Sequence, residues 1–386
     1  MLVTGAYYPE ISAAAVQCRA VAAALDGRAV ISVLTTAVDS ALPAVSTVDG
    51  VAVYRVHVDV GSRASKIAAS LRLAAHLVRA RRTYAVIHVH GVSQKNVAVA
   101  IIARLLGKRL VLSLHTAGQD EPRAAARGGP LASWAFRAPD LVLSVSPDLA
   151  ARWTAANLPA DRIRLAPNGV DTARFAPASD GERADLRRAI GWPANTPVAL
   201  FVGFFSRDKR PDLLFRAWRR VSTGGIRSRL AFVGAKGAGY YEIDAALAGE
   251  IGRSAVEFGC TDEVMFIDAT HEIEKYVRAA DVYVLPSIRE AHPLALLEAM
   301  ACGLPCIATR LPGSTDAIID DGVNGRLFPP DDEVALAAAL RDVLSNPAAG
   351  RALGARARAT VTARYDIGRT ADQWLSAYRT VLNRGE

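Results

Sequence analysis

The sequence predicts an α/β protein with two doubly wound domains, each a parallel sheet covered by helices. Short apolar strands alternate with alanine-rich or amphipathic helices along the first half of the chain, and the alternation restarts at residue 198. The chain has 386 residues, about two to three times the usual length of one domain. Hydrophobic residues make up 51% and charged residues 22%, which is ordinary for a folded globular protein.

In the first half, runs rich in Val, Leu and Ile predict strands at 30–34, 51–56, 86–90, 110–114 and 141–145. Helical spacing of apolar residues predicts helices at 16–25, 66–80 and 97–106. Residues 171–195 interrupt the alternation with Pro177, Gly181, Gly191 and Pro193, so this segment is the expected linker. The expected N-terminal domain is 1–175.

In the second half, the expected strands are 198–205, 229–233, 264–267, 282–285 and 306–309, with a further short element at 316–319. The expected helices are 211–221, 241–257, 273–279, 294–302 and 333–344. The C-terminal domain is expected over 176–366. Ligands of such sheets bind beyond the carboxyl ends of the strands, so the loops that follow the strands are the candidate sites.

The positive charge is concentrated in the first half. Residues 1–175 hold 20 Lys/Arg against 11 Asp/Glu, whereas residues 176–386 hold 26 against 27. Between Asp59 and Asp120 the chain has ten basic residues and no acidic one. Nucleic acid is not favoured as a partner, because no aromatic residues interleave with the basic ones. An anionic membrane surface, a phosphorylated acceptor and a plain solvated surface stay open.

The cysteine content, the N-terminal residues and the apolar stretches indicate the cellular compartment of the protein. Four cysteines in 386 residues are too few for a disulfide framework. The first ten residues have no basic segment and include Pro9 and Glu10, unlike a signal peptide. No stretch approaches the length of an apolar membrane span. We therefore expect a cytoplasmic protein, with membrane association on the cytoplasmic face as an option.

The segment 286–305 is the richest candidate site. A strand is expected to end at Leu285, and Pro293 has a preset backbone angle that suits the first position of a helix. Such a helix start directs unpaired backbone N–H groups toward a ligand and suits a diphosphate. Glu290 and Glu298 can accept hydrogen bonds from hydroxyls at two ends of one extended polar ligand. Alternatively, Glu290 only caps the helix and Glu298 is an ordinary helical residue.

The pattern Pro-Ser-x-x-Glu at 286–290, followed by Glu-Ala-Met-Ala-x-Gly-x-Pro at 298–305, resembles the donor-site signature of retaining glycosyltransferase family four, the group one glycosyl transferases. Further segments resemble other motifs of this family, in the same order: 86–91, 113–116, 166–171, 201–203, 209–214 and 321–325. The resemblance implies the GT-B fold, in which two Rossmann-like domains face one another across a cleft. It also implies that the last segment, 367–386, forms a helix that packs back on the N-terminal domain.

Carried over residue by residue, the resemblance implies that His115 and Glu290 are catalytic, with Glu290 on the donor sugar's hydroxyls. It implies that Glu298 binds the ribose hydroxyls and that Lys209 binds the diphosphate, because a diphosphate needs a compact cation beside it. The expected donor-binding set is Gly203, Arg207, Lys209, Glu290, Ala291, His292, Leu294 and Glu298. The expected acceptor or cleft set is Ser12, Ala13 and His90.

The implied activity is transfer of a hexose from a nucleoside-diphosphate sugar to an acceptor hydroxyl with retention, in glycan, glycolipid or polysaccharide synthesis. No Asp-x-Asp sequence occurs in the chain, so no metal and no cofactor are expected. The acceptor is open between lipid-linked and phosphorylated compounds. The segment Arg63–Arg82 is either a membrane-facing surface or a core-packing helix with a solvated face.

Two other functions stay open. One is a nucleotide-sugar epimerase or hydrolase of the same fold, which would bind the donor without an acceptor. The other is a non-catalytic sugar-nucleotide-binding protein. Two departures from the family pattern favour the second: Phe204 stands where an arginine is usual, and Pro293 removes a backbone donor.

Overall fold

The computed structural model describes residues 1–236 and 243–383, and the chain divides into two compact units. The first unit contains Met1–Gly169 and the chain from Ile367 onward, and the second contains Val170–Asp366. The predicted boundary at 175/176 lies too late along the chain. Val170 forms a β-bridge with Asp366, and the Phe175 ring is buried in the core of the second unit.

The expected linker at 171–195 is also part of the second unit. It contains a ten-residue helix, α7 (Asp180–Ala189), which begins with a capping box formed by Ser179 and Glu182. Trp192 is buried in the same core as Phe175. Gly181 lies inside α7, whereas Pro177, Gly191 and Pro193 lie in the loops before and after it, within a domain.

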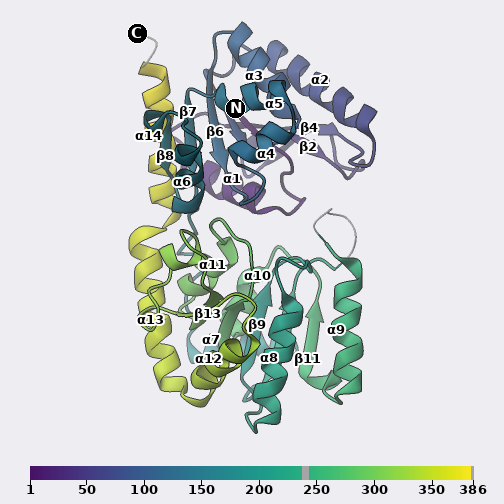
Figure 1. Ribbon diagram of the computed structural model, residues 1–386, viewed down its shortest axis with the longest axis vertical. Coiled ribbons are helices and arrows are strands. Elements are labelled where there is room, and N and C mark those ends of the chain that lie inside the picture. The colour runs from purple at the N-terminus through teal and green to yellow at the C-terminus, as the bar shows by residue number, and fades with distance from the viewer. Residues whose placement is uncertain (237–242, 384–386) are drawn as a thin grey trace. The chain divides into compact units, whose positions relative to one another are not determined.

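The first unit contains an eight-stranded sheet with the order β3-β4-β2-β1-β5-β6-β7-β8 (Figure 1). The strands are β1 (Leu2–Thr4), β2 (Ser32–Ala37), β3 (Val45–Val48), β4 (Val51–His57), β5 (Val86–His90), β6 (Arg109–Leu114), β7 (Leu141–Ser144) and β8 (Ile163–Leu165). Every neighbouring pair is parallel except β3 and β4, which form an antiparallel edge.

The helices of the first unit are α1 (Ala13–Ala24), α2 (Arg63–Arg79), α3 (Lys95–Leu105), α4 (Pro122–Arg127), α5 (Pro130–Arg137), α6 (Pro147–Ala155) and α14 (Ile367–Asn383). Helix α14 packs on α1, and its residues Trp374 and Tyr378 are buried in one hydrophobic cluster with Val21 of α1. Helix α1 connects β1 to β2 and α3 connects β5 to β6, and these two connections run in opposite directions along the sheet. Right-handed crossovers therefore place α1 and α3 on opposite faces.

The second unit contains a six-stranded parallel sheet with the order β11-β10-β9-β12-β13-β14 (Figure 1). The strands are β9 (Val198–Val202), β10 (Arg229–Val233), β11 (Val264–Ile267), β12 (Val282–Leu285), β13 (Cys306–Thr309) and β14 (Arg326–Phe328). The strand order reverses between β9 and β12. In doubly wound sheets such a reversal is the usual place for a ligand.

Beside α7, the helices of the second unit are α8 (Pro211–Thr223), α9 (Ala245–Glu257), α10 (Ile273–Ala279), α11 (Leu294–Ala301), α12 (Glu333–Ser345) and α13 (Pro347–Arg364). The predicted helix 241–257 begins at Ala245, and Tyr241 and Glu242 lie outside the described residues. The end of the predicted strand 198–205 is a loop after Val202. The short element expected at 316–319 is a 3-10 helix, Thr315–Ala317.

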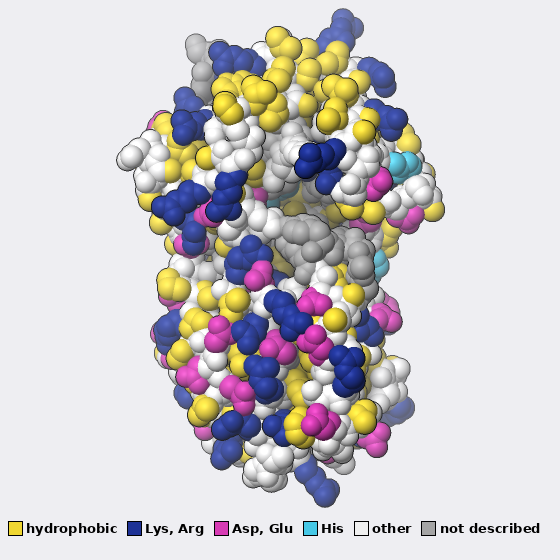
Figure 2. Space-filling model, turned by 45° about the vertical axis from the view of Figure 1, so that its right-hand side comes forward, with side chains coloured by type: hydrophobic (Ala, Val, Ile, Leu, Met, Phe, Trp, Pro, Cys, Tyr) yellow, Lys and Arg dark blue, Asp and Glu magenta, His cyan; other side chains and the backbone are white. Residues whose placement is uncertain are grey.

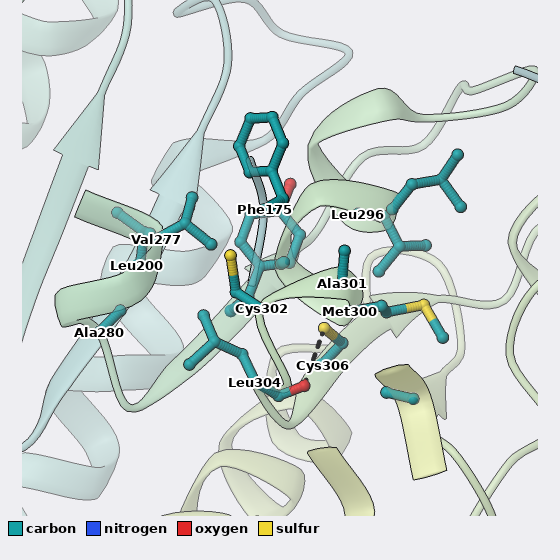
Figure 3. Packing of buried hydrophobic residues seen from close by; sticks show 14 of the residues in the cluster. Phe175, Leu200, Val277, Ala280, Leu296, Met300, Ala301, Cys302, Leu304 and Cys306 are labelled. Carbon is teal, nitrogen blue, oxygen red and sulfur yellow. Dashed lines mark hydrogen bonds between the residues drawn. The ribbon is translucent and has the colours of Figure 1, made fainter. Parts of the chain in front are cut away.

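The core of the second unit includes two cysteines that lie four positions apart in the sequence. Cys302 and Cys306 lie among Phe175, Leu296 and Met300 (Figure 3). The Cys306 thiol donates to the carbonyl oxygen of Leu304, with Sγ and O 3.4 Å apart (Figure 3). Both cysteines are free and buried, and they fill the core as small side chains.

None of the helices within 1–236 and 243–383 is long and apolar enough to cross a membrane.

Candidate active site

The second unit presents two loops at its switch point, one after β9 (203–210) and one after β12 (286–293). Asp208 joins them twice: its carbonyl oxygen accepts from the Ile288 N–H over 2.8 Å, and its carboxylate pairs with Arg289. A third connection is the ion pair between Lys209 and Glu290. Strands far apart in sequence thus bring the expected diphosphate lysine to the expected sugar glutamate.

The Lys209–Glu290 pair is short and largely shielded from solvent. The Lys209 Nζ lies 2.7 Å from Glu290 Oε1, and only 9% of the Glu290 side chain is exposed. An ammonium has three donors, so pairing with one carboxylate leaves Lys209 able to donate to a ligand as well.

Glycines bring the first loop close to its neighbour. The Gly203 N–H donates to the Val233 carbonyl oxygen over 3.0 Å. A Cβ on Gly234 would lie 1.8 Å from the Gly203 carbonyl oxygen, so only glycine fits at position 234. The predicted site residue Gly203 therefore lies where two backbones touch.

Helix α11 starts at Leu294, as the predicted helix 294–302 does. Pro293 is its N-cap residue and not its first helical residue, and no side chain caps the helix. The backbone N–H groups of the first turn are therefore available to an anionic group. Ala291 and His292, which precede this turn, are both buried.

His292 is a buried, uncharged side chain just before the start of α11. Its ring meets the Tyr365 ring edge-on, with centroids 5.1 Å apart. Burial lowers the pKa of His292 to about 3, so the imidazole is neutral near pH 7.

Glu298 is a buried carboxylate on α11. Only 8% of Glu298 is exposed, and its side chain makes no hydrogen bond with any of the described residues. Burial raises the pKa of Glu298 to about 7, although the nearby positive charge of Arg174 lowers it. The Arg174 guanidinium forms an ion pair with Glu274, whose Oε2 lies 2.7 Å away. A buried carboxyl without partners is costly, so this position suits a ligand with hydroxyl groups.

Arg207 is placed differently from Lys209. Its guanidinium donates to Asp244 over 2.7 Å and to Glu250 over 3.0 Å, and 57% of the side chain is exposed. The structure therefore ties Arg207 to the start of α9, whereas Lys209 and Glu290 form a separate pair.

In the first unit, the imidazoles of buried His90 and half-buried His115 form a pair at the ends of β5 and β6. His90 Nδ1 lies 3.0 Å from His115 Nε2. Burial lowers the pKa of His115 to about 4 and the pKa of His90 well below its ordinary value. Both rings are neutral near pH 7. His90 Nε2 is buried without a hydrogen-bond partner among the described residues.

A second set of side chains packs around the His90–His115 pair. His88 Nδ1 lies 2.8 Å from the Tyr378 hydroxyl, and His88 Nε2 lies 2.7 Å from Ser113 Oγ. The Trp374 ring contacts His88 and His90, with centroids 4.7 and 4.9 Å apart. Side chains of α14 therefore orient the two β5 histidines, His88 and His90.

Asp120 holds the backbone around His115. Its carboxylate accepts from the N–H groups of His115 (2.7 Å), Thr116 (2.9 Å) and Val92 (2.7 Å). The loops after β5 and β6 are therefore joined by one buried carboxylate.

Ser12 and Ala13 occupy the start of α1. Ser12 Oγ accepts from the Ala15 N–H over 3.1 Å as the N-cap, and Ala13 is the exposed first residue of the helix. The Ser12 hydroxyl therefore has a structural role in this conformation.

Lys95 is a candidate that the sequence analysis missed. It is the first residue of α3 and only 9% exposed. Burial lowers the pKa of Lys95 to about 8. The sequence shows it only as one of ten basic residues, and lysines are rarely buried. Its place directly after the β5 loop was the available signal.

Across residues 1–236 and 243–383, no group of three or more His, Cys, Asp or Glu side chains could hold a metal ion.

Comparison with known proteins places both units in one family. The family model described as Glycosyl transferases group 1 matches residues 182–360, and the model described as Glycosyltransferase Family 4 matches residues 14–174. The D-inositol 3-phosphate glycosyltransferase of Nocardiopsis dassonvillei is 34% identical over 304 residues, covering 73% of this chain and 67% of that protein. The enzyme of that name from Kineococcus radiotolerans is 37% identical over 235 residues, covering 57% of this chain. The match spans about half of the Kineococcus protein, 52% of its length.

Solved structures share the fold over nearly the whole chain. Sucrose-phosphate synthase from Thermosynechococcus elongatus has a TM-score of 0.80 at 23% identity, covering 99% of both chains. HepE from Anabaena, in complex with UDP-glucose, has a TM-score of 0.79 at 18% identity, covering 98% of this chain and 99% of that one. The expected fold and family are confirmed: the chain belongs to the group 1 glycosyl transferases of glycosyltransferase family 4 and has the GT-B fold.

Proposed function

We propose that this chain is a retaining hexosyltransferase that moves a sugar from a nucleoside-diphosphate sugar to an acceptor hydroxyl. The observation that carries the proposal is the shielded Lys209–Glu290 pair next to the uncapped start of α11, at the switch point of the second sheet. This combination offers positive charge to a diphosphate and a carboxylate to sugar hydroxyls.

In this proposal the Lys209 ammonium and the first N–H groups of α11 bind the diphosphate. Negative charge grows on the diphosphate as the bond to the sugar breaks, and fixed donors stabilise it. Glu290, held by Lys209, accepts from the sugar hydroxyls. Glu298 accepts from the ribose hydroxyls, which would supply its missing hydrogen bonds.

His115 is proposed to contact the sugar as a neutral hydrogen-bonding group whose ring is oriented by His90. Its low pKa supports this role, because a cationic imidazole would repel an oxocarbenium-like sugar.

We propose front-face attack for the retention of configuration. Glu290 and Glu298 are assigned to hydroxyls at two ends of the donor, which leaves neither of them free as a nucleophile behind the anomeric carbon. The acceptor oxygen forms the new bond as the bond to the phosphate oxygen breaks, and that phosphate oxygen takes the acceptor's proton.

The positive charge for the diphosphate is proposed to come from the protein. We expect activity to survive a chelator, and full loss with EDTA that Mg²⁺ restores would contradict this part of the proposal.

Mass spectrometry of products tests the function directly. UDP-glucose is the first donor to try because HepE binds it, and D-inositol 3-phosphate the first acceptor because relatives are named for it. GDP- and ADP-sugars and other phosphorylated or lipid-linked acceptors follow. A glycosylated product with the donor's anomeric configuration supports the proposal. Donor breakdown at the same rate with and without acceptor would identify a hydrolase or epimerase. Donor binding without turnover of any pair would identify a non-catalytic protein.

A further inference from the structure

The switch point of the first sheet lies between β1 and β5, because β2 and β4 follow β1 on one side and β6 to β8 follow β5 on the other. Lys95 reaches this point from the start of α3. A Cβ built on Gly5, in the loop after β1, would lie 3.5 Å from Lys95 Nζ. A buried ammonium therefore lies at the edge of the sheet where ligands bind.

This ammonium has no counter-ion at contact distance. Among the described residues it makes no ion pair, and Asp120 acts on it only through space. The Asp120 carboxylate is already bound by three backbone N–H groups, those of Val92, His115 and Thr116. The neighbouring His90 and His115 are neutral. A buried charge without a partner is costly, so the site lacks an anion.

We propose that Lys95 binds an anionic group of the acceptor, a phosphate or a carboxylate. The link to the acceptor rests on the proposed function, whereas the binding of an anion by Lys95 does not. The bound anion would form the contact ion pair that Asp120 does not form with Lys95.

Site-specific amine labelling of the full chain tests this subsite. The chain is treated with limiting acetic anhydride at pH 8 in chloride, phosphate, methyl phosphate or acetate of equal ionic strength, and peptides are read by mass spectrometry. We expect phosphate at a few times its dissociation constant to slow labelling of Lys95 about fivefold. Labelling of Lys66 on α2, the internal reference, stays within twofold. Protection by phosphates alone indicates a phosphorylated acceptor, and equal protection by acetate indicates a carboxylate. Equal labelling of Lys95 in all four salts would overturn the proposal.

Variants separate binding from structure. In a Lys209→Met background, which removes the donor-side cation, Lys95→Met is expected to keep or raise the melting temperature and to abolish stabilisation by phosphate. Lys95→Arg is expected to retain part of that stabilisation. A drop in melting temperature with an unchanged phosphate response would show a structural lysine and overturn the proposal. Protection by phosphate in a chain that transfers no sugar would support the anion site and overturn only its assignment to the acceptor.

A second inference comes from the outer surface of α2, α3 and α5, which pack side by side. Large apolar side chains face outward on all three: Ile67 (61% exposed) and Leu71 (64%) on α2, Leu105 (75%) on α3 and Leu131 (65%) on α5. Figure 2 shows hydrophobic side chains gathered at the top of the first unit with Lys and Arg at their border. Helix α2 buries a separate stripe, including Leu73 and Leu77. It therefore packs on the core and also presents an apolar outer face.

The same helices carry charge of one sign. Helices α2 to α5 contain no Asp or Glu. Their exposed basic residues are Arg63, Arg72, Arg79, Arg104, Arg123, Arg127 and Arg137. An apolar patch on helices that carry basic and no acidic residues complements an anionic lipid surface, because the cations attract the headgroups while the apolar side chains enter the interface.

We infer that this face, formed by α2, α3 and α5, binds the surface of an anionic bilayer. Vesicle co-sedimentation of the full chain tests it, with phosphatidylcholine alone and with one third phosphatidylglycerol. We expect binding to the anionic vesicles that falls about tenfold in Arg72→Gln/Arg79→Gln or in Leu71→Ser/Leu105→Ser. The matched control Val256→Ser/Val334→Ser removes side chains that are 68% and 62% exposed on α9 and α12, and it should bind like the wild type.

Three results would overturn the membrane inference. The first is no binding to anionic vesicles at low salt, and the second is an equal loss of binding in the control variant. The third is a concentration-dependent dimer, seen by light scattering, that Leu71→Ser/Leu105→Ser abolishes, because a second copy would then cover this face.

Discussion

The loops at the switch points of the two sheets hold their charged groups in opposite ways. The second unit pairs them within itself: Lys209 with Glu290, Asp208 with Arg289, and Arg207 with acidic residues of the α9 region. The first unit keeps buried histidines neutral and leaves the Lys95 ammonium without an ion pair among the described residues. The second unit is thus organised for a ligand by its own charges, whereas the first unit needs a ligand to balance its charge.

The largest effect is expected from Lys209→Met. It removes the proposed diphosphate cation and leaves Glu290 buried without its partner, so kcat/KM should fall roughly 100- to 1000-fold. Arg207→Met is the matched control, because its exposed guanidinium is tied to Asp244 and Glu250; less than about threefold loss is expected. Steady-state kinetics with the identified donor measures both. Equal losses would show that Arg207 leaves α9 to bind the donor.

Acid should weaken the first unit more than the second. The folded pKa of His115 is about 4 against an ordinary 6.5, so the unfolded chain binds the proton more readily. The free energy of unfolding therefore falls as pH drops from 6.5 toward 4, by about 3 kcal/mol for this group, and is unaffected above 6.5. His88 and His90 shift in the same direction, whereas the second unit has one such buried histidine, His292.

Hydrogen exchange at pH 7 and pH 5 measures this difference. Peptides from β5 and β6 should lose more protection at pH 5 than peptides from β12 and β13. Equal losses in the two sheets would contradict the assignment of the acid-sensitive groups to the first unit.

Asp120→Ala should destabilise the first unit by about 2–3 kcal/mol, because three half-buried backbone N–H groups lose their acceptor. Asp148→Ala is the control, since it removes an exposed ion pair with Arg152 and should cost less than about 1 kcal/mol. Urea unfolding followed by Trp fluorescence compares the variants. Similar costs would show that water replaces the Asp120 carboxylate.

The smallest effect concerns pH and the nucleotide. The pKa of Glu298 is about 7, and ribose hydroxyls donate to its ionised form. The ionised fraction rises from about a tenth at pH 6 to about nine tenths at pH 8, so nucleotide affinity should rise up to about ninefold. Calorimetric titration at both pH values measures this. Glu298→Gln should bind with a flat pH profile, and a rise that persists in this variant would assign it to another group.

Much of the fold could be predicted because buried parallel strands are continuous apolar runs. Strands β10 and β12 begin and end where Val, Leu and Phe runs predict. The edge strand β3 was missed because Val45–Val48 alternates exposed and half-buried residues in a Ser/Thr-rich segment. Helix α13 was missed because it contains Gly350 and Gly354, which disfavour helix in isolation.

Tertiary packing explains one of these glycines. A Cβ on Gly354 would lie 1.9 Å from the Gly303 carbonyl oxygen, so α13 needs glycine to approach that loop. The site shows the same limit. Lys209 and Glu290 were found because both belong to motifs of the family that the sequence resembles, although they lie 81 positions apart. No motif names the acidic partners of Arg207, and the burial of Lys95 depends on the whole sheet.

The most direct test of the donor site is thermal stabilisation by UDP, GDP and ADP in the wild type and in Lys209→Met. One nucleotide at about 100 times its dissociation constant should add about 2.7 kcal/mol to the free energy of unfolding of the wild type. The same concentration should add much less to Lys209→Met. Stabilisation by none of the three, or equal stabilisation of both proteins, would contradict the assignment of the diphosphate to Lys209.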